Sequence, residues 1–117
     1  MNSSTKIALP EAMEAHASDA ANLMKALGNE SRLMILCLLA EGERSVGQLN
    51  DAIPLSQSAL SQQLARLRSQ GIVQTRRASQ TIYYTLADGP AEKIIRLLHD
   101  IYCPVPGRAA ARKEKPA

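Results

Sequence analysis

The apolar residues of this chain recur at helical spacing almost throughout, with one interruption at residues 72–86. There, two runs rich in β-branched and aromatic residues, 72–77 and 81–86, are separated by the three residues 78–80, which predicts a β-hairpin. Glycine, proline and the N-cap residues Asn29, Ser45 and Ser56 divide the remainder into five expected helices, at 11–27, 30–41, 46–53, 57–70 and 91–102. The pattern predicts a mainly helical fold with a small β-hairpin.

The core of this fold must be aliphatic, because the chain has no Phe, no Trp and only three Tyr. A chain of 117 residues holds one domain rather than two stable cores. We expect that domain at residues 11–103, with a flexible arm at 1–10 and a disordered basic tail at 104–117. The helix at 30–41 is apolar almost all round, so we expect it to be the central, buried one.

Residues 46–70 have the pattern of a helix-turn-helix. Two helices are joined by a tight Pro-Leu-Ser turn, and Leu60, Leu64 and Leu67 form an apolar stripe on the second helix. The opposite stripe carries Gln, Ser and Arg, which read base edges or bind phosphates, and the hairpin after it would be a wing. A merely solvated polar face is the alternative, although such faces usually mix Glu with Lys.

Charge is distributed unevenly along the chain. The net charge is only +3, but residues 52–87 contain no Asp or Glu and include Arg66, Arg68, Arg76 and Arg77. An acid-free basic block is typical of a surface that binds a polyanion. The scarcity of aromatic residues argues against RNA or single-stranded DNA binding by base stacking, so we expect double-stranded DNA as the partner.

No membrane segment or export signal is expected. The longest apolar run, residues 33–40, is too short to span a bilayer, and the first sixteen residues lack the apolar stretch of a signal peptide. We therefore expect a cytoplasmic protein whose thiols are normally reduced. By this reasoning Cys37 and Cys103 are buried spectators, metal ligands or redox-active residues.

Three stretches, NESRLMILCLL (29–39), LSQSALSQQLARLRSQGIVQTRR (55–77) and TIYYTL (81–86), resemble the ArsR/SmtB family of winged-helix repressors. The resemblance covers roughly residues 18–103. It implies a winged helix-turn-helix homodimer, paired through its first and last helices, that leaves operator DNA when an effector binds. The expected DNA-binding residues are Gln57, Ser58, Ser61, Gln62, Gln63, Arg66, Arg76, Arg77 and Gln80. Gln63 stands where the family motif often has His.

Many members of this family sense metals, but the metal ligands of the family are missing here. Ser45 and Gly47 occupy the positions of the thiolates in the third-helix motif. The last-helix motif is also incomplete, because Pro90 stands where its first His belongs and Tyr102 where its Glu belongs. We expect no metal and no cofactor, and we expect His16 and His99 to be surface or partner-capping residues.

The motifs Ile35-Leu36-Cys37 and Tyr102-Cys103 resemble the sulfide- and redox-responsive branch of the family. That resemblance implies a dithiol switch, Cys37 with Cys103, bridged by reactive sulfur species or oxidants. One alternative is a family regulator whose cysteines are spectators; another is a protein-interaction module. A third is a thiol enzyme, but no Thr, Glu or His lies near Cys37 in the sequence, and an apolar run should raise its pKa. We therefore expect no enzyme and no catalytic residues.

Overall fold

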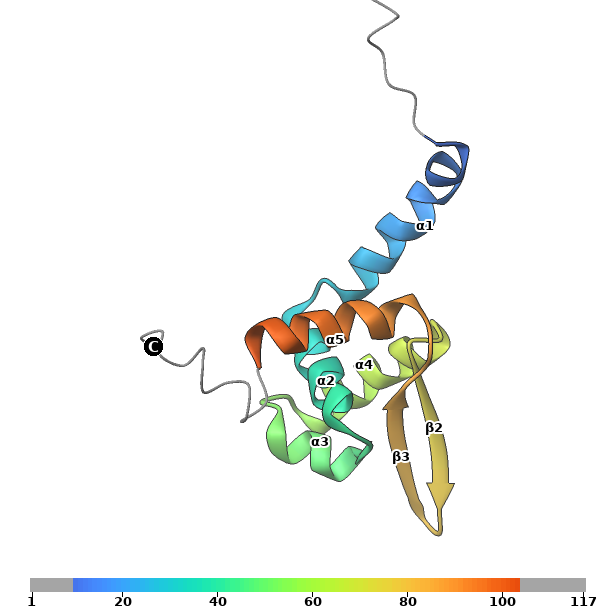
Figure 1. Ribbon diagram of the computed structural model, residues 1–117. Helices are drawn as coiled ribbons and strands as arrows, with labels where there is room; N and C mark the ends of the chain where they lie inside the picture. The colour runs from blue at the N-terminus through green and yellow to red at the C-terminus, as the bar shows by residue number, and fades with distance from the viewer. Residues whose placement is uncertain (1–9, 104–117) are drawn as a thin grey trace, which may run out of the picture.

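The computed structural model describes residues 10–103 and contains five helices and three strands in that range (Figure 1). The predicted arm and tail fall almost wholly outside the described residues. The elements in chain order are α1 (Glu11–Leu27), α2 (Glu30–Glu41), β1 (Arg44–Ser45), α3 (Val46–Ala52), α4 (Gln57–Ser69), β2 (Val73–Ala78), β3 (Thr81–Leu86) and α5 (Pro90–Tyr102). The predicted order of helices and hairpin is confirmed.

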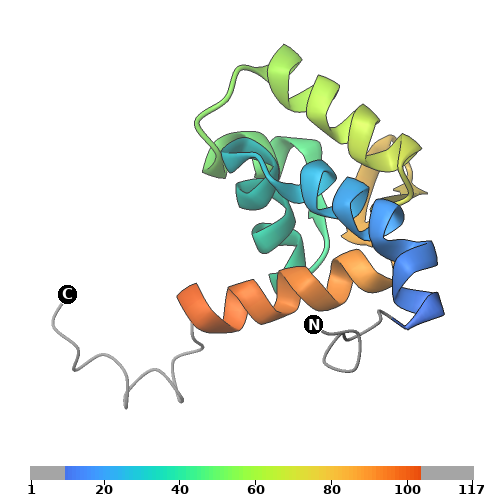
Figure 2. The ribbon, with the colours of Figure 1, turned by 90° about the horizontal axis from the view of Figure 1, so that it is seen from above.

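The core is aliphatic and centres on α2, as the sequence predicts. Ile35, Leu36 and Leu39 of α2 are buried, and Figure 2 shows this helix between α5 and α4. The α4 leucines at positions 60, 64 and 67 are all buried in the same core. The apolar stripe of α4 is therefore what fixes its polar stripe on the outside.

Side-chain caps set where three helices begin. The side chain of Asn29 accepts a hydrogen bond from the backbone N–H of Arg32, and Ser56 does the same for Ala59, both at 3.1 Å. Ser45 caps α3 in a reciprocal capping box with Gln48. These caps confirm the predicted starts of α2, α3 and α4.

The sheet differs from the prediction in two ways. It has three strands in the order β1-β3-β2, because Arg44 and Ser45 pair with Tyr84 and Tyr83 of β3. A strand of two residues has no periodicity of its own, so the sequence does not reveal it. The predicted three-residue turn is also wrong: residue 78 pairs with residue 81, which leaves a two-residue turn, 79–80.

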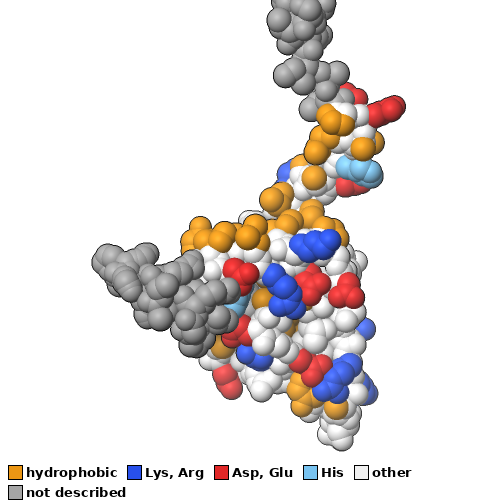
Figure 3. Space-filling view, in the orientation of Figure 1, with side chains coloured by type: hydrophobic (Ala, Val, Ile, Leu, Met, Phe, Trp, Pro, Cys, Tyr) orange, Lys and Arg blue, Asp and Glu red, His pale blue; other side chains and the backbone are white. Residues whose placement is uncertain are grey.

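Large apolar side chains stay exposed along α1 and α5. Only the last two residues of α1, positions 26 and 27, are buried, while Met13 and Met24 are exposed. On α5, Leu97, Ile101 and Tyr102 are exposed as well. Figure 3 shows these hydrophobic side chains running along α1 and over the edge of the body formed by α5. One chain alone leaves both apolar stripes uncovered.

Candidate functional site

The outer face of α4 gathers most of the predicted DNA-binding residues. α3 and α4 are joined by the short turn 53–56, and the buried leucines hold α4 with its polar stripe outward. The exposed members of this stripe are Gln57, Ser58, Ser61, Gln62 and Arg66. Amide, hydroxyl and guanidinium groups on one exposed helical face suit recognition of base edges and phosphates.

Gln63 is not part of this outer face. It is half-buried, and its Oε1 accepts a hydrogen bond of 2.9 Å from Nε of Arg32. Arg32 also donates to the backbone carbonyl of Ala26 at 3.1 Å. The Gln63 amide thus ties α4 to α2 and to the end of α1.

The two adjacent wing arginines have different surroundings. The guanidinium of Arg76 binds both carboxylate oxygens of Glu43, at 2.6 Å and 2.7 Å, and lies 4.7 Å from the ring centroid of Tyr83. The hydrogen bond with Arg76 lowers the pKa of the Glu43 carboxyl, and the same bond raises the pKa of Arg76. The side chain of Arg77 is exposed and has no hydrogen-bond or ion-pair partner among residues 10–103. Gln80 lies exposed in the turn.

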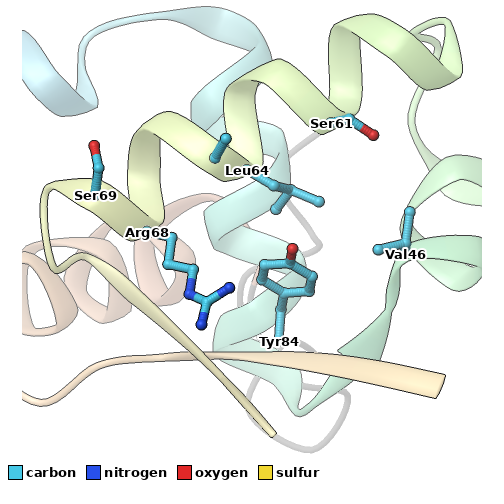
Figure 4. A pocket seen from close by; sticks show the side chains of 7 residues that line it. Val46, Ser61, Leu64, Arg68, Ser69 and Tyr84 are labelled. Atoms are coloured by element: carbon cyan, nitrogen blue, oxygen red, sulfur yellow. The ribbon is translucent and has the colours of Figure 1, made fainter. Parts of the chain in front are cut away.

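A groove of about 420 Å³ separates α4 from the wing. Figure 4 shows Arg68 of α4 and Tyr84 of β3 pointing into the same space, with Leu64 between the helix and the strand. The groove is lined by Val46, Ser61, Leu64, Ala65, Arg68, Ser69 and Tyr84. The expected DNA-binding residues do not include Arg68, although the acid-free block contains it.

A second cavity, of about 240 Å³, brings the two cysteines together. Cys37 comes from α2 and is half-buried, whereas Cys103 follows α5 and is exposed. Both are free thiols, and the backbone N–H of Cys103 donates to the carbonyl of His99 at 2.7 Å. The lining residues are Met34, Cys37, Leu38, Glu41, Ala52, Ile53 and Cys103. We call this cavity the cysteine pocket.

Burial raises the pKa of the Cys37 thiol, and the charges of Cys103 and Glu41 raise it further. The direction agrees with the prediction from the apolar run. The expectation that no Glu lies near Cys37 is wrong, because Glu41, one helical turn later, lines the same pocket. Glu41 disfavours the thiolate rather than activating it.

Glu41 also connects the cysteine pocket to other elements. One of its carboxylate oxygens lies 3.0 Å from Nε2 of His99 on α5, and the other lies 3.5 Å from the Arg44 guanidinium of β1. His99 is thus a partner of Glu41, while His16 lies on the surface, 3.7 Å from Asp19.

Within residues 10–103, no group of three or more His, Cys, Asp or Glu side chains is placed to hold a metal ion. In the same range, no helix is long and apolar enough to cross a membrane.

Comparison with known proteins identifies the family. Residues 29–75 match the model of the bacterial regulatory protein arsR family. The chain is 50% identical to the transcriptional activator HlyU of Vibrio cholerae over 91 residues, which are 78% of this chain and 84% of that protein. It is 46% identical to the biofilm growth-associated repressor of Xylella fastidiosa over 93 residues, 80% of this chain and 82% of that one.

Solved structures agree with these relatives. Reduced HlyU from Vibrio cholerae superposes with a TM-score of 0.74 at 49% identity, over 80% of this chain and 99% of that one. The transcriptional repressor BigR from Xylella fastidiosa gives a TM-score of 0.75 at 43% identity, over 92% and 98% of the two chains. This chain belongs to the ArsR family of winged helix-turn-helix transcriptional regulators, which bind DNA and are not enzymes.

Proposed function

We propose that this protein is a dithiol-controlled repressor, which binds operator DNA when reduced and releases it when Cys37 and Cys103 are bridged within one chain. The observation that carries the proposal is the cysteine pocket, where two residues far apart in the sequence line one cavity between α2 and the end of α5. Bridging a loop of this length lowers the entropy of the unfolded chain. This effect stabilises the folded, bridged form by roughly 4 kcal/mol of free energy, so the bridged form is not intrinsically unstable.

The bridge forms by one of two balanced routes. Hydrogen peroxide oxidises the two thiols to a disulfide: the O–O bond breaks, one S–S bond forms, and two waters leave. Alternatively, two molecules of glutathione persulfide each transfer one sulfur atom, one to each thiol, and leave as two molecules of glutathione. The two resulting cysteine persulfides then condense, expel hydrogen sulfide and leave a trisulfide bridge. Exposed Cys103 meets the effector first, because burial raises the pKa of the Cys37 thiol and limits its thiolate.

The bridge would act on DNA binding through a homodimer. The apolar stripes of α1 and α5, including Met24 and Leu97, are available to bury against a second copy. Because Cys103 directly follows α5, a bridge to α2 changes the position of this dimer helix. The two α4 helices must match half-sites about 34–36 Å apart, so a small rotation weakens both contacts. A loss of about 10- to 1,000-fold in affinity requires about 1.4–4 kcal/mol of coupling.

The proposed DNA contacts divide between bases and phosphates. Gln62, with its exposed neighbours Gln57, Ser58 and Ser61, faces outward on α4 to read base edges in the major groove. Arg66, Arg77 and Gln80 are exposed at the ends of this surface, where phosphates lie. Gln63, held by Arg32, supports the helix from behind rather than contacting a base.

We propose no metal and no cofactor for this switch, since Ser45 and Gly47 replace the family's thiolate ligands. Added zinc, with chelator and reductant controlled, should leave the DNA affinity of the reduced protein unchanged. A tight, stoichiometric zinc site that releases DNA would contradict this part of the proposal.

The dithiol mechanism is tested with Cys37→Ser, Cys103→Ser and the double variant. A duplex selected from a randomised library with the reduced wild type serves as the probe. All three variants should bind it when reduced, because neither cysteine lies on the outer face of α4. None should release it on treatment with glutathione persulfide, and the two single defects should not add in the double variant. If Cys103→Ser still releases DNA on treatment, the bridge mechanism is wrong.

A further inference from the structure

Arg76 and Arg77 are neighbours in sequence but lie on opposite faces of the wing. The strand register places Arg76 opposite Tyr83 and Arg77 opposite Ile82, and consecutive strand residues point to opposite faces of a sheet. Arg76 shares its face with Tyr83 and is bound by Glu43, while Arg77 faces solvent. One basic pair in the sequence therefore becomes two separate groups in the fold.

The bond between Arg76 and Glu43 spans the whole sheet. Glu43 directly precedes β1, at one edge, while Arg76 lies on β2, at the other edge, with β3 between them. Tyr83 of β3 pairs with Arg76 on one side and with Ser45 of β1 on the other. The guanidinium lies over the Tyr83 ring and binds the Glu43 carboxylate, so one contact joins side chains of β2 and β3 to the residue that precedes β1.

This contact also reaches the helix-turn-helix. Ser45 is both the last residue of β1 and the N-cap of α3, so β1 leads into α3 without a linker. β1 has only two residues, and few backbone hydrogen bonds can hold it against β3. A bidentate arginine–carboxylate pair has defined geometry as well as strength, and it supplies a second connection between the wing and α3.

We propose that Arg76 is a positioning residue and not a phosphate contact: with Glu43 and Tyr83 it fixes the wing relative to α3 and α4, while Arg77 binds the DNA backbone. We call the Glu43–Tyr83–Arg76 contact the wing clamp. If Arg76 left Glu43 for a phosphate, it would leave an unpaired carboxylate near the DNA, where like charges repel. The inference rests on the proposed mode of DNA binding and deepens it.

The test compares wild type, Arg76→Ala, Arg77→Ala and the charge-swapped double variant Glu43→Arg/Arg76→Glu, all reduced. The affinity for a mixed-sequence duplex is measured at a series of salt concentrations. Each lost phosphate contact reduces the steepness of the plot of log binding constant against log salt concentration by about 0.9. Arg77→Ala should lower the slope by that amount. Arg76→Ala should keep the wild-type slope, with an affinity about two- to five-fold weaker. The charge swap should restore most of that affinity, since it rebuilds the pair with its ends exchanged.

Amide hydrogen exchange in β1 and β3 provides a readout that needs no DNA. Arg76→Ala should speed this exchange, Arg77→Ala should not, and the charge swap should slow it again. The wing clamp is overturned if Arg76→Ala lowers the salt slope as much as Arg77→Ala does, or if the two single variants exchange alike. If the wild type binds no DNA, the proposed function fails, and the exchange data still decide the wing clamp.

Discussion

Two regions of the molecule are built in opposite ways: the surface formed by α4 and the wing, and the cysteine pocket. The proposed DNA-binding surface comes from one continuous stretch, residues 56–86, in which most side chains are positioned by the helical period of α4 or by the strand register of the wing. The cysteine pocket joins parts of α2, the end of α3 and the residue after α5. The geometry of this surface is therefore set mostly within one segment, whereas the cysteine pocket depends on how separate elements pack. The proposed switch couples the two regions through this packing.

The first prediction compares the packing of the two regions. Leu64→Ala, in the closed core under α4, should lower the free energy of unfolding by about 2–5 kcal/mol, because it leaves a cavity. Met34→Ala, at the half-buried lining of the cysteine pocket, should cost less than about 2 kcal/mol. Urea unfolding at one fixed protein concentration measures both. Equal losses would mean that the cysteine pocket is closed in solution.

The second prediction separates two adjacent glutamines. Gln62→Ala should relax sequence preference at its contacted base by about 1–3 kcal/mol, because a paired amide reads that base directly. Gln63→Ala should leave sequence preference intact and lower stability by about 1 kcal/mol through loss of its bond with Arg32. Selection from a randomised duplex library with each variant measures preference. Relaxed preference in Gln63→Ala would place that side chain in the DNA interface.

The third prediction concerns the start of α4. Ser56→Ala should lower the free energy of unfolding by about 1 kcal/mol, since the cap on the Ala59 N–H is lost. Ser61→Ala, exposed on the outer face of the same helix, is the matched control and should change stability by less than about 0.5 kcal/mol. Thermal unfolding compares the two variants. A similar loss in both would show that the cap does not stabilise α4.

The fourth prediction tests the electrostatics of the cysteine pocket. In a Cys103→Ser background, where Cys37 is the only thiol, Glu41→Gln should lower the pKa of Cys37 by removing a negative charge that raises it. A lower pKa means more thiolate at pH values below the midpoint, so alkylation by iodoacetamide should accelerate a few-fold and its pH profile should move to lower pH. Glu30→Gln, at the other end of α2, is the control. An unchanged profile in Glu41→Gln would exclude this role for Glu41.

The features that could be predicted from the sequence of this protein are those that neighbouring residues determine. The leucine stripe of α4 and the caps at Asn29, Ser45 and Ser56 depend on residues within a turn or two, and the structure confirms them. The short strand β1 and the bond between Glu43 and Arg76 depend on contacts between residues far apart in the sequence, so no local pattern predicts them. The family resemblance, rather than any local pattern, predicts that the two cysteines act as a pair.

The most direct test of the account measures DNA affinity and intact mass on one sample, taken reduced, after treatment with glutathione persulfide or peroxide, and after re-reduction. We predict that a single chain loses two hydrogens with peroxide, or loses two hydrogens and gains one sulfur atom with persulfide. In the same treated sample, affinity for the selected duplex should fall about 10- to 1,000-fold and recover with reductant. Bridged protein that binds this duplex as tightly as reduced protein would contradict the account.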